Sequence, residues 1–173
     1  MAASTRRIAL ASLFGVLILA IMGFIPPPSS DYLIIFQSFF LGLSYLLVGR
    51  GGATYVGAVS GLLITFVKFN FFPLDLVFSI LFGVLVDLTA AGLRARDGRR
   101  ASAGRLAGSL MVSTGIVGFV AYYVTAVMTN LVPNELVLDL SVLIFGVVSG
   151  GIGGVVAARV WNRNLMARFQ SGH

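Results

Sequence analysis

Long uncharged runs of Leu, Val, Ile and Phe alternate along the chain with short breaks made of Pro, Gly, Asn or Arg. Runs of about 17–25 apolar residues are long enough to cross a bilayer as one helix. The pattern predicts six such helices, over Ile8–Ile25, Leu33–Val48, Ala53–Phe72, Pro73–Leu93, Leu106–Val132 and Leu136–Val160. We therefore expect an all-α integral membrane protein, a compact bundle of six transmembrane helices that forms a single membrane domain over residues 1–173.

The breaks between the runs support this division. The triplet Pro26-Pro27-Pro28 stops the first helix, because proline has no amide proton to donate. Only Gly49–Gly52 separates the second and third runs, so these helices are expected to be antiparallel neighbours. Pro73 suits the start of the fourth helix, where an amide proton would have no partner. The first run is longer than the apolar part of a usual signal peptide, and we expect it to be retained as a helix.

The positions of the basic residues predict how the helices are oriented across the membrane. With six crossings both termini lie on one side, and that side would hold eleven of the twelve basic residues: Arg6, Arg7, Arg50, Arg94, Arg96, Arg99, Arg100, Arg105, Arg159, Arg163 and Arg168. Lys and Arg accumulate in cytoplasmic loops, so both termini are expected to be cytoplasmic. The formal net charge of +6 then follows from the topology, and no nucleic-acid partner is expected.

The composition excludes several classes of function. Hydrophobic residues make up 58% of the chain and charged residues 10%, whereas soluble domains contain about 25% charged residues. A soluble globular enzyme is therefore excluded. The chain has no Cys and one His, the terminal His173, and it contains no metalloprotease, nucleophile-elbow or P-loop motif. We expect neither catalysis by this chain nor a metal or cofactor.

Polar side chains near the side opposite the termini are the candidate substrate-binding residues: Lys68, Asn70, Asp75, Tyr122, Tyr123, Asn130 and Asp139. Aromatic rings for stacking, with a few polar groups for orientation, are typical of small-molecule sites. Lys68 either extends its charge to the interface or lines an outward-facing pocket with Asp75. The preferred interpretation of Asp75 alone is a carboxylate at a helix N-terminus. The amide of Gln37 is on the same side.

Two further features concern helix packing. Asp87 lies in the cytoplasmic half of the fourth helix, where an ion pair with an arginine is expected. Small residues recur at four-residue spacing, as in Gly57-xxx-Gly61 and in Gly146-xxx-Gly150-xxx-Gly154, and such spacing lets helices approach closely in lipid. In the first helix, the Ala11-xxx-Gly15 pair either packs inside the bundle or docks a second membrane protein.

Several segments together suggest a known family. A basic N-terminus leads into Arg7–Gly15, a proline-rich loop follows, and then come Phe36–Phe40, the Gly49–Gly52 link, Leu81-Phe82-Gly83 and Ala158-Arg159-Val160. This layout resembles the substrate-binding S components of energy-coupling factor (ECF) transporters over nearly the whole chain. The resemblance implies a binder of a vitamin-like or trace nutrient in the plasma membrane that needs no cofactor of its own. Transport in that family is thought to involve tilting of the whole component.

The resemblance also implies partners. They are a transmembrane coupling protein and a pair of cytoplasmic ATPases, and the contacts to the coupling protein would fall on Ala11 and Gly15, with Ala9 nearby. The N-terminal histidine of the metal-binding relatives is absent, and no motif identifies a ligand. A competing interpretation is a non-catalytic accessory subunit that scaffolds a larger membrane complex. An ion-coupled carrier is the weakest alternative, because it needs a charged residue at mid-depth.

Overall fold

The computed structural model describes residues 2–24, 33–67, 73–98, 100–129 and 136–166. Its long helices are α1 (Ala2–Ile18), α2 (Ile34–Val48), α3 (Gly52–Val67), α4 (Leu74–Gly92), α5 (Ala103–Thr129) and α6 (Leu136–Val160). The π-helical turns η1 (Leu19–Gly23) and η4 (Trp161–Leu165) continue α1 and α6. An antiparallel hairpin of β1 (Arg96–Asp97) and β2 (Arg100–Ala101) joins α4 to α5. The predicted helical architecture is confirmed, with this hairpin as an addition.

The helix boundaries differ from the predicted ones where polar residues continue a helix beyond its apolar run. Helix α1 begins at Ala2 rather than Ile8, and α5 begins at Ala103 rather than Leu106. Hydropathy does not detect such ends, because a polar first turn outside the apolar run carries no hydrophobic signal. Pro73 is the N-cap of α4, and its carbonyl oxygen accepts a hydrogen bond from the Val77 amide at 3.1 Å, as its predicted place at the helix start requires.

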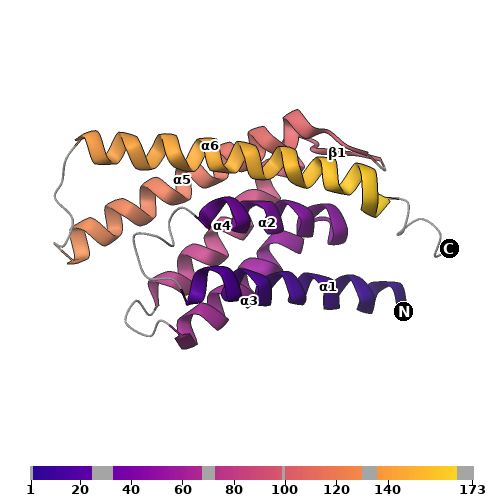
Figure 1. The fold of residues 1–173 in the computed structure, drawn as a ribbon, viewed down its shortest axis with the longest axis horizontal. Helices are drawn as coiled ribbons and strands as arrows, with labels where there is room; N and C mark the ends of the chain where they lie inside the picture. The colour runs from indigo at the N-terminus through magenta and orange to yellow at the C-terminus, as the bar shows by residue number, and fades with distance from the viewer. Residues whose placement is uncertain (1, 25–32, 68–72, 99, 130–135, 167–173) are drawn as a thin grey trace.

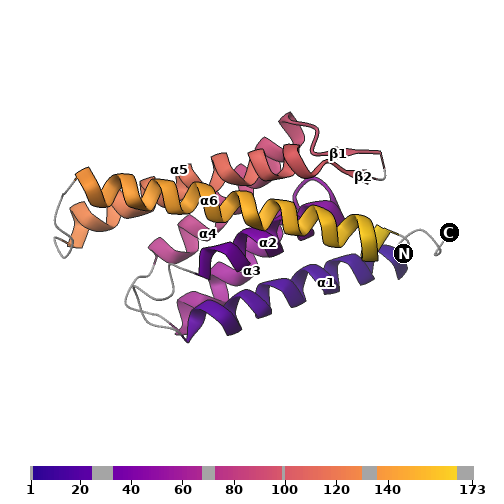
Figure 2. The ribbon, with the colours of Figure 1, turned by 45° about the horizontal axis from the view of Figure 1, so that its top comes forward.

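Helix α2 is the centre of the bundle. It contacts α1, α3, α4, α5 and α6, and the five other helices surround it (Figures 1 and 2). Every residue from Leu41 to Leu47 is buried. A helix buried on all sides needs apolar or small residues around its whole circumference, and this segment supplies them. The short link at Gly49–Gly52 makes α2 and α3 neighbours, as predicted.

The two ends of the bundle differ in charge. The start of α1, the link between α2 and α3, the β1–β2 hairpin and η4 lie at the same end (Figure 1). We call this the arginine end, because its described residues include Arg50, Arg94, Arg96, Arg100 and Arg163. At the opposite end, α5 and α6 extend beyond the other helices (Figures 1 and 2).

The surface of the bundle is apolar, and its interior contains polar groups. On α6 an exposed line runs through Ile144, Val148, Ile152 and Val156, which are 55%, 51%, 48% and 41% exposed. Large exposed apolar surfaces are rare on soluble monomers. Within the described residues three helices are long and apolar enough to cross a membrane: Leu74–Gly92, Ala103–Val124 and Leu143–Leu165. Shorter apolar helices cover Ile8–Gly23, Ile34–Val48 and Gly52–Val67.

Several glycines bring neighbouring helices into close contact, and the small-residue spacing predicted this at Gly150. A Cβ atom on Gly83 of α4 would lie 2.5 Å from the Ala53 carbonyl oxygen of α3. A Cβ atom on Gly150 of α6 would lie 2.5 Å from the Leu110 carbonyl oxygen of α5. The pairs α3–α4 and α5–α6 therefore pack backbone against backbone, and a methyl group at either position would separate them.

Candidate functional site

The predicted substrate residues are only partly covered by the structure. Lys68, Asn70 and Asn130 lie outside the described residues, and so does the side chain of Asp139 on α6. Asp75 lies half-buried in the first turn of α4, where a carboxylate is favoured by the helix dipole. Its predicted position at a helix N-terminus is confirmed. The gathering of these residues into one pocket stays a prediction.

The two adjacent tyrosines of α5 face different surroundings. Tyr122 is half-buried, whereas Tyr123 is 55% exposed. Tyr123 continues a line of exposed side chains along α5 that passes through Val112, Ile116 and Phe119. It therefore lies on the outer surface of the bundle, and a contact between Tyr123 and a substrate stays a prediction.

The residues predicted to contact a coupling protein are likewise partly exposed and partly buried. Ala9 is exposed, but Ala11 is fully buried. A Cβ atom on Gly15 would lie 2.7 Å from the Val59 Cγ1 atom of α3. Ala11 and Gly15 thus belong to internal packing of α1, which is one of the two alternatives left open by the sequence. Of the three residues, Ala9 remains available for a partner.

Asp87 is part of the connection between α4 and α3. Its carboxylate accepts hydrogen bonds from the Ala53 amide at 3.3 Å and from the Thr54 amide at 2.8 Å, and from the Thr54 hydroxyl at 2.6 Å. The first amides of a helix have no partner within the helix, and a carboxylate there is favoured by the helix dipole. The expectation of an ion pair with an arginine is therefore corrected, because the described partners of Asp87 are the N-terminal groups of α3.

Hydroxyl groups form a satisfied polar seam inside the bundle. The Ser38 hydroxyl of α2 lies 3.3 Å from that of Thr114 on α5. The Thr89 hydroxyl of α4 lies 2.7 Å from the Ser109 hydroxyl and 2.9 Å from the Ser113 hydroxyl, both on α5. In a lipid-exposed bundle such bonds hold helices together. Since these groups already satisfy one another, we assign them to structure.

Three other buried polar side chains lack such partners. Gln37 of α2 is 8% exposed, Ser79 of α4 is 8% exposed and Ser149 of α6 is 4% exposed. Within the part of the chain that the structure describes, none of the three side chains makes a hydrogen bond. The free energy penalty is greatest for Gln37, because its carboxamide has two donor protons and an acceptor oxygen. A buried amide without a partner costs roughly 1–3 kcal/mol.

Gln37 and Ser79 lie on the half of the bundle away from the arginine end. Gln37 is in the first turn of α2 and Ser79 is in the second turn of α4, and both helices run from the opposite end toward the arginine end. Ser149 lies near the middle of α6. The sequence placed Gln37 on this side but gave no reason to select it, because hydropathy does not show that α2 is the central helix.

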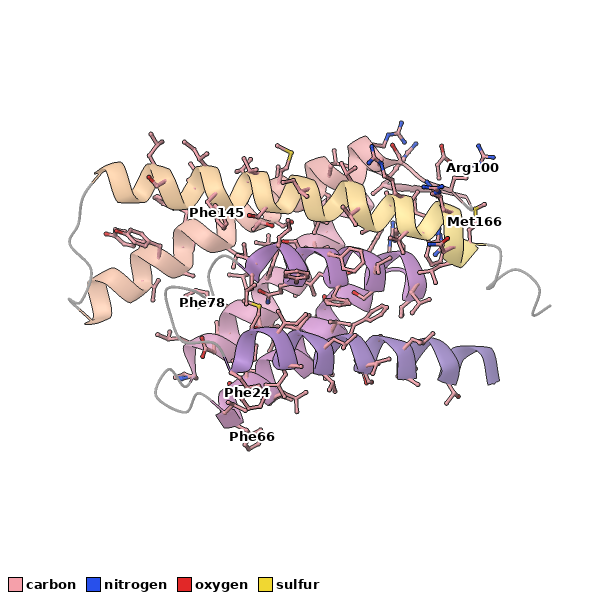
Figure 3. The ribbon with its side chains drawn as sticks, viewed as in Figure 1. Phe24, Phe66, Phe78, Arg100, Phe145 and Met166 are labelled. Carbon is pink, nitrogen blue, oxygen red and sulfur yellow. The ribbon has the colours of Figure 1, made fainter. Side chains whose placement is uncertain are left out.

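The arginine end is held together by specific contacts. The Asn162 side chain of η4 accepts a hydrogen bond from the Ala101 amide at 3.0 Å and donates one to the Ala101 carbonyl oxygen at 2.9 Å. The Arg96 Nη1 atom donates to the Leu46 carbonyl oxygen at 3.0 Å, and its Cζ atom lies 5.6 Å from the ring centroid of Trp161. Figure 3 shows Arg100 at this end of the bundle, away from Phe24 and Phe66.

The described ranges contain no group of three or more His, Asp or Glu side chains that could hold a metal ion. Comparisons with protein-family models, with curated proteins and with solved structures found no match for this chain. Proposals about its function are therefore drawn from its own residues and from the resemblance described above.

Proposed function

We propose that the chain is a multi-pass protein of the plasma membrane whose six helices all cross the bilayer, with both termini in the cytoplasm. The apolar surface and the separation of arginines to one end support this topology. On α5, Tyr123 follows Arg105 by 18 positions, or roughly 27 Å at 1.5 Å per residue. This length is close to the roughly 30 Å thickness of the hydrocarbon core. Arg105 and Tyr123 would then lie at the two interfaces.

The shorter helices fit the same bilayer with local adjustment. Helix α2 has 15 residues and α3 has 16 residues, so each is roughly 22–24 Å long at 1.5 Å per residue. Short spans are tolerated through local thinning of the bilayer and through flanking residues. Residues 41–47 of helix α2 are in addition buried inside the bundle by the other helices.

For the function, we propose the substrate-binding subunit of an ECF-type importer that takes up a vitamin-like or trace nutrient. The observation that supports it best is the buried amide of Gln37 on the central helix, which has no hydrogen-bond partner among the described residues. A polar side chain inside a membrane bundle commonly marks a substrate pathway. The carboxamide would donate to and accept from a small polar ligand, such as one carrying an amide, a carboxylate or a ring nitrogen.

The other predicted residues complete this proposal. Asp75 and Tyr122 are half-buried on α4 and α5, and we propose that they provide charge complementarity and stacking for the same ligand. Lys68, Asn70, Asn130, Asp139 and Tyr123 are kept as proposed substrate residues on the basis of the sequence alone. Energy for transport would come from the partner ATPases, so the chain itself would not be an enzyme.

Ligand binding is tested with Gln37→Leu. The purified protein in neutral detergent is heated with and without a panel of water-soluble vitamins and a small-molecule extract of source cells. A compound that stabilises the natural protein should have no effect on Gln37→Leu. Without ligand, the variant should be at least as stable as the natural protein, because the buried amide has been replaced by an apolar side chain. Ser38→Ala is the matched control, since it changes the adjacent buried polar residue, and it should keep the ligand response. An unchanged response in Gln37→Leu would remove Gln37 from the site.

The partners are tested by native mass spectrometry of the protein extracted gently from its source. A coupling protein and ATPases that co-purify would support the importer, and Ala9→Leu should weaken that association, since Ala9 is exposed. Ala11→Leu is the contrast, because it should destabilise the chain itself through clashes in the α1 packing. Stoichiometric retention in a large complex without ATPases would instead identify an accessory subunit.

A further inference from the structure

The end of α4 carries an arginine in a conformation that usually belongs to glycine. Arg94 has a φ of +50°, in the left-handed region. The Arg94 amide donates to the Ala91 carbonyl oxygen at 3.1 Å, and the Ala95 amide donates to the Ala90 carbonyl oxygen at 2.8 Å. These two bonds form a Schellman motif, whose left-handed residue is most often glycine. A side chain at this position strains the backbone, and residues kept in such conformations cluster at functional sites.

A second guanidinium lies against this strained residue. The Arg105 Nη1 atom donates a hydrogen bond to the Arg94 carbonyl oxygen at 3.4 Å. The side chains of both arginines are exposed. Among the described residues, the Arg94 guanidinium has no hydrogen-bond partner or counterion. An anion bound where the two residues meet would be attracted to both positive charges.

An apolar surface continues directly from the two arginines. Leu93, which precedes Arg94 at the end of α4, is 46% exposed, and Val112 of α5 is 50% exposed. The Leu93 Cδ1 atom lies 3.9 Å from the point that a Cβ atom would occupy on Gly108, so Leu93 covers the first turns of α5. Val112 lies two helical turns after Arg105 on the same face of α5. The two positive charges therefore adjoin an apolar surface, as the headgroup of a lipid adjoins its acyl chains at a membrane interface.

We propose that Arg94 and Arg105 bind the phosphate of an anionic phospholipid, with the acyl chains along Leu93 and Val112. Guanidinium groups suit phosphate because their N–H groups form paired, charge-assisted hydrogen bonds. The adjoining apolar surface favours a lipid over a soluble anion. Arg96 is not part of this site, since the Leu46 carbonyl oxygen and the Trp161 ring already hold it. The site depends on the membrane location but not on a transport function.

The test compares unfolding of the purified full-length protein in mixed micelles that contain phosphatidylglycerol or phosphatidylcholine. Phosphatidylglycerol should raise the unfolding temperature more than phosphatidylcholine does, with a smaller effect from inorganic phosphate. In Arg94→Gly and in Arg105→Gln the apparent affinity for phosphatidylglycerol should fall about tenfold. Arg94→Gly should remain folded and be at least as stable as the natural protein in phosphatidylcholine, because glycine relieves the left-handed strain.

The matched control is Arg50→Gln, which removes an exposed positive charge at the same end but in the link between α2 and α3. It should keep the response to phosphatidylglycerol. An equal loss in Arg50→Gln would show a general charge effect and overturn the site. Equal stabilisation by both lipids, or by inorganic phosphate alone, would overturn it as well. If Arg94→Gly fails to fold, Arg105→Gln decides, since Arg105 lies in a regular helix.

Discussion

Removing the carboxylate of Asp87 should destabilise the bundle by separating α4 from the start of α3. All four initial amides of α3 are accounted for. The Gly52 amide donates to the Gly49 carbonyl oxygen, the Tyr55 amide donates to the Gly51 carbonyl oxygen, and Asp87 accepts the two amides between them. Asp87 is 8% exposed, so water does not readily replace it.

The loss can be estimated from these contacts. The Thr54 amide, at 2.8 Å, would be left without its partner, which costs about 1–2 kcal/mol, and the longer bond from the Ala53 amide, at 3.3 Å, adds about 0.5 kcal/mol. The charge at the helix N-terminus contributes about 0.5–1 kcal/mol. The Thr54 hydroxyl can rotate to a backbone carbonyl and adds little. Asp87→Ala should therefore lower the free energy of unfolding by about 3 kcal/mol. Asp87→Asn keeps one acceptor oxygen and should lose about half as much.

The assay is unfolding by SDS in mixed micelles, followed by tryptophan fluorescence. The chain has one tryptophan, Trp161, which is buried beneath Arg96 and reports unfolding of the arginine end. The control is Asp97→Asn, at an exposed position of the hairpin, where a change below about 0.5 kcal/mol is expected. A loss below about 1 kcal/mol for Asp87→Ala, or an equal loss for Asp97→Asn, would refute the proposed helix cap.

Two further predictions concern packing and the hairpin. Gly83→Ala should lower the free energy of unfolding by about 1–3 kcal/mol, because its Cβ atom would lie 2.5 Å from the Ala53 carbonyl oxygen. The same change at Gly118, where the added Cβ atom would lie in open space, should instead raise the free energy of unfolding by about 0.5–1 kcal/mol. Equal effects of the two changes would contradict the backbone contact between α3 and α4. Asn162→Ala should speed cleavage of the hairpin by trypsin about tenfold. We expect the change to lower the free energy of local opening of the hairpin by about 1.4 kcal/mol, which makes the open form about ten times more populated. Unchanged cleavage would show that Asn162 does not hold the hairpin.

The helices could be predicted because their apolar runs are long and the breaks between them are clear. Pro73 marks the start of α4, and the glycine-rich link at residues 49–52 makes α2 and α3 neighbours. The β1–β2 hairpin could not be predicted, because its strands have two residues each and depend on Asn162, which is distant in sequence. The polar first turn of α1 was missed for a related reason, since it lies outside any apolar run.

The site residues were harder to predict than the helices. Identifying the partner of Asp87 requires knowing that α4 turns this residue toward the start of α3, and a rotation of one residue changes a helix face by about 100°. The arginine expected beside Asp87 is a plausible partner by charge, but the backbone amides of α3 lie closer in the fold. Selecting Gln37 requires knowing that α2 is the central helix, which depends on contacts with all the other helices.

The same packing limits how the bundle can respond to a ligand at Gln37. The backbone contacts at Gly83 and Gly150 leave no room for α4 to slide along α3, or for α6 to slide along α5, without breaking them. Closely packed interfaces shift between discrete arrangements rather than deforming continuously. A ligand held by the central helix would therefore act more on the orientation of the bundle as one body than on the packing within these helix pairs. Tilting of the whole component, which we propose for the importer because of its resemblance to ECF S components, would leave these contacts intact.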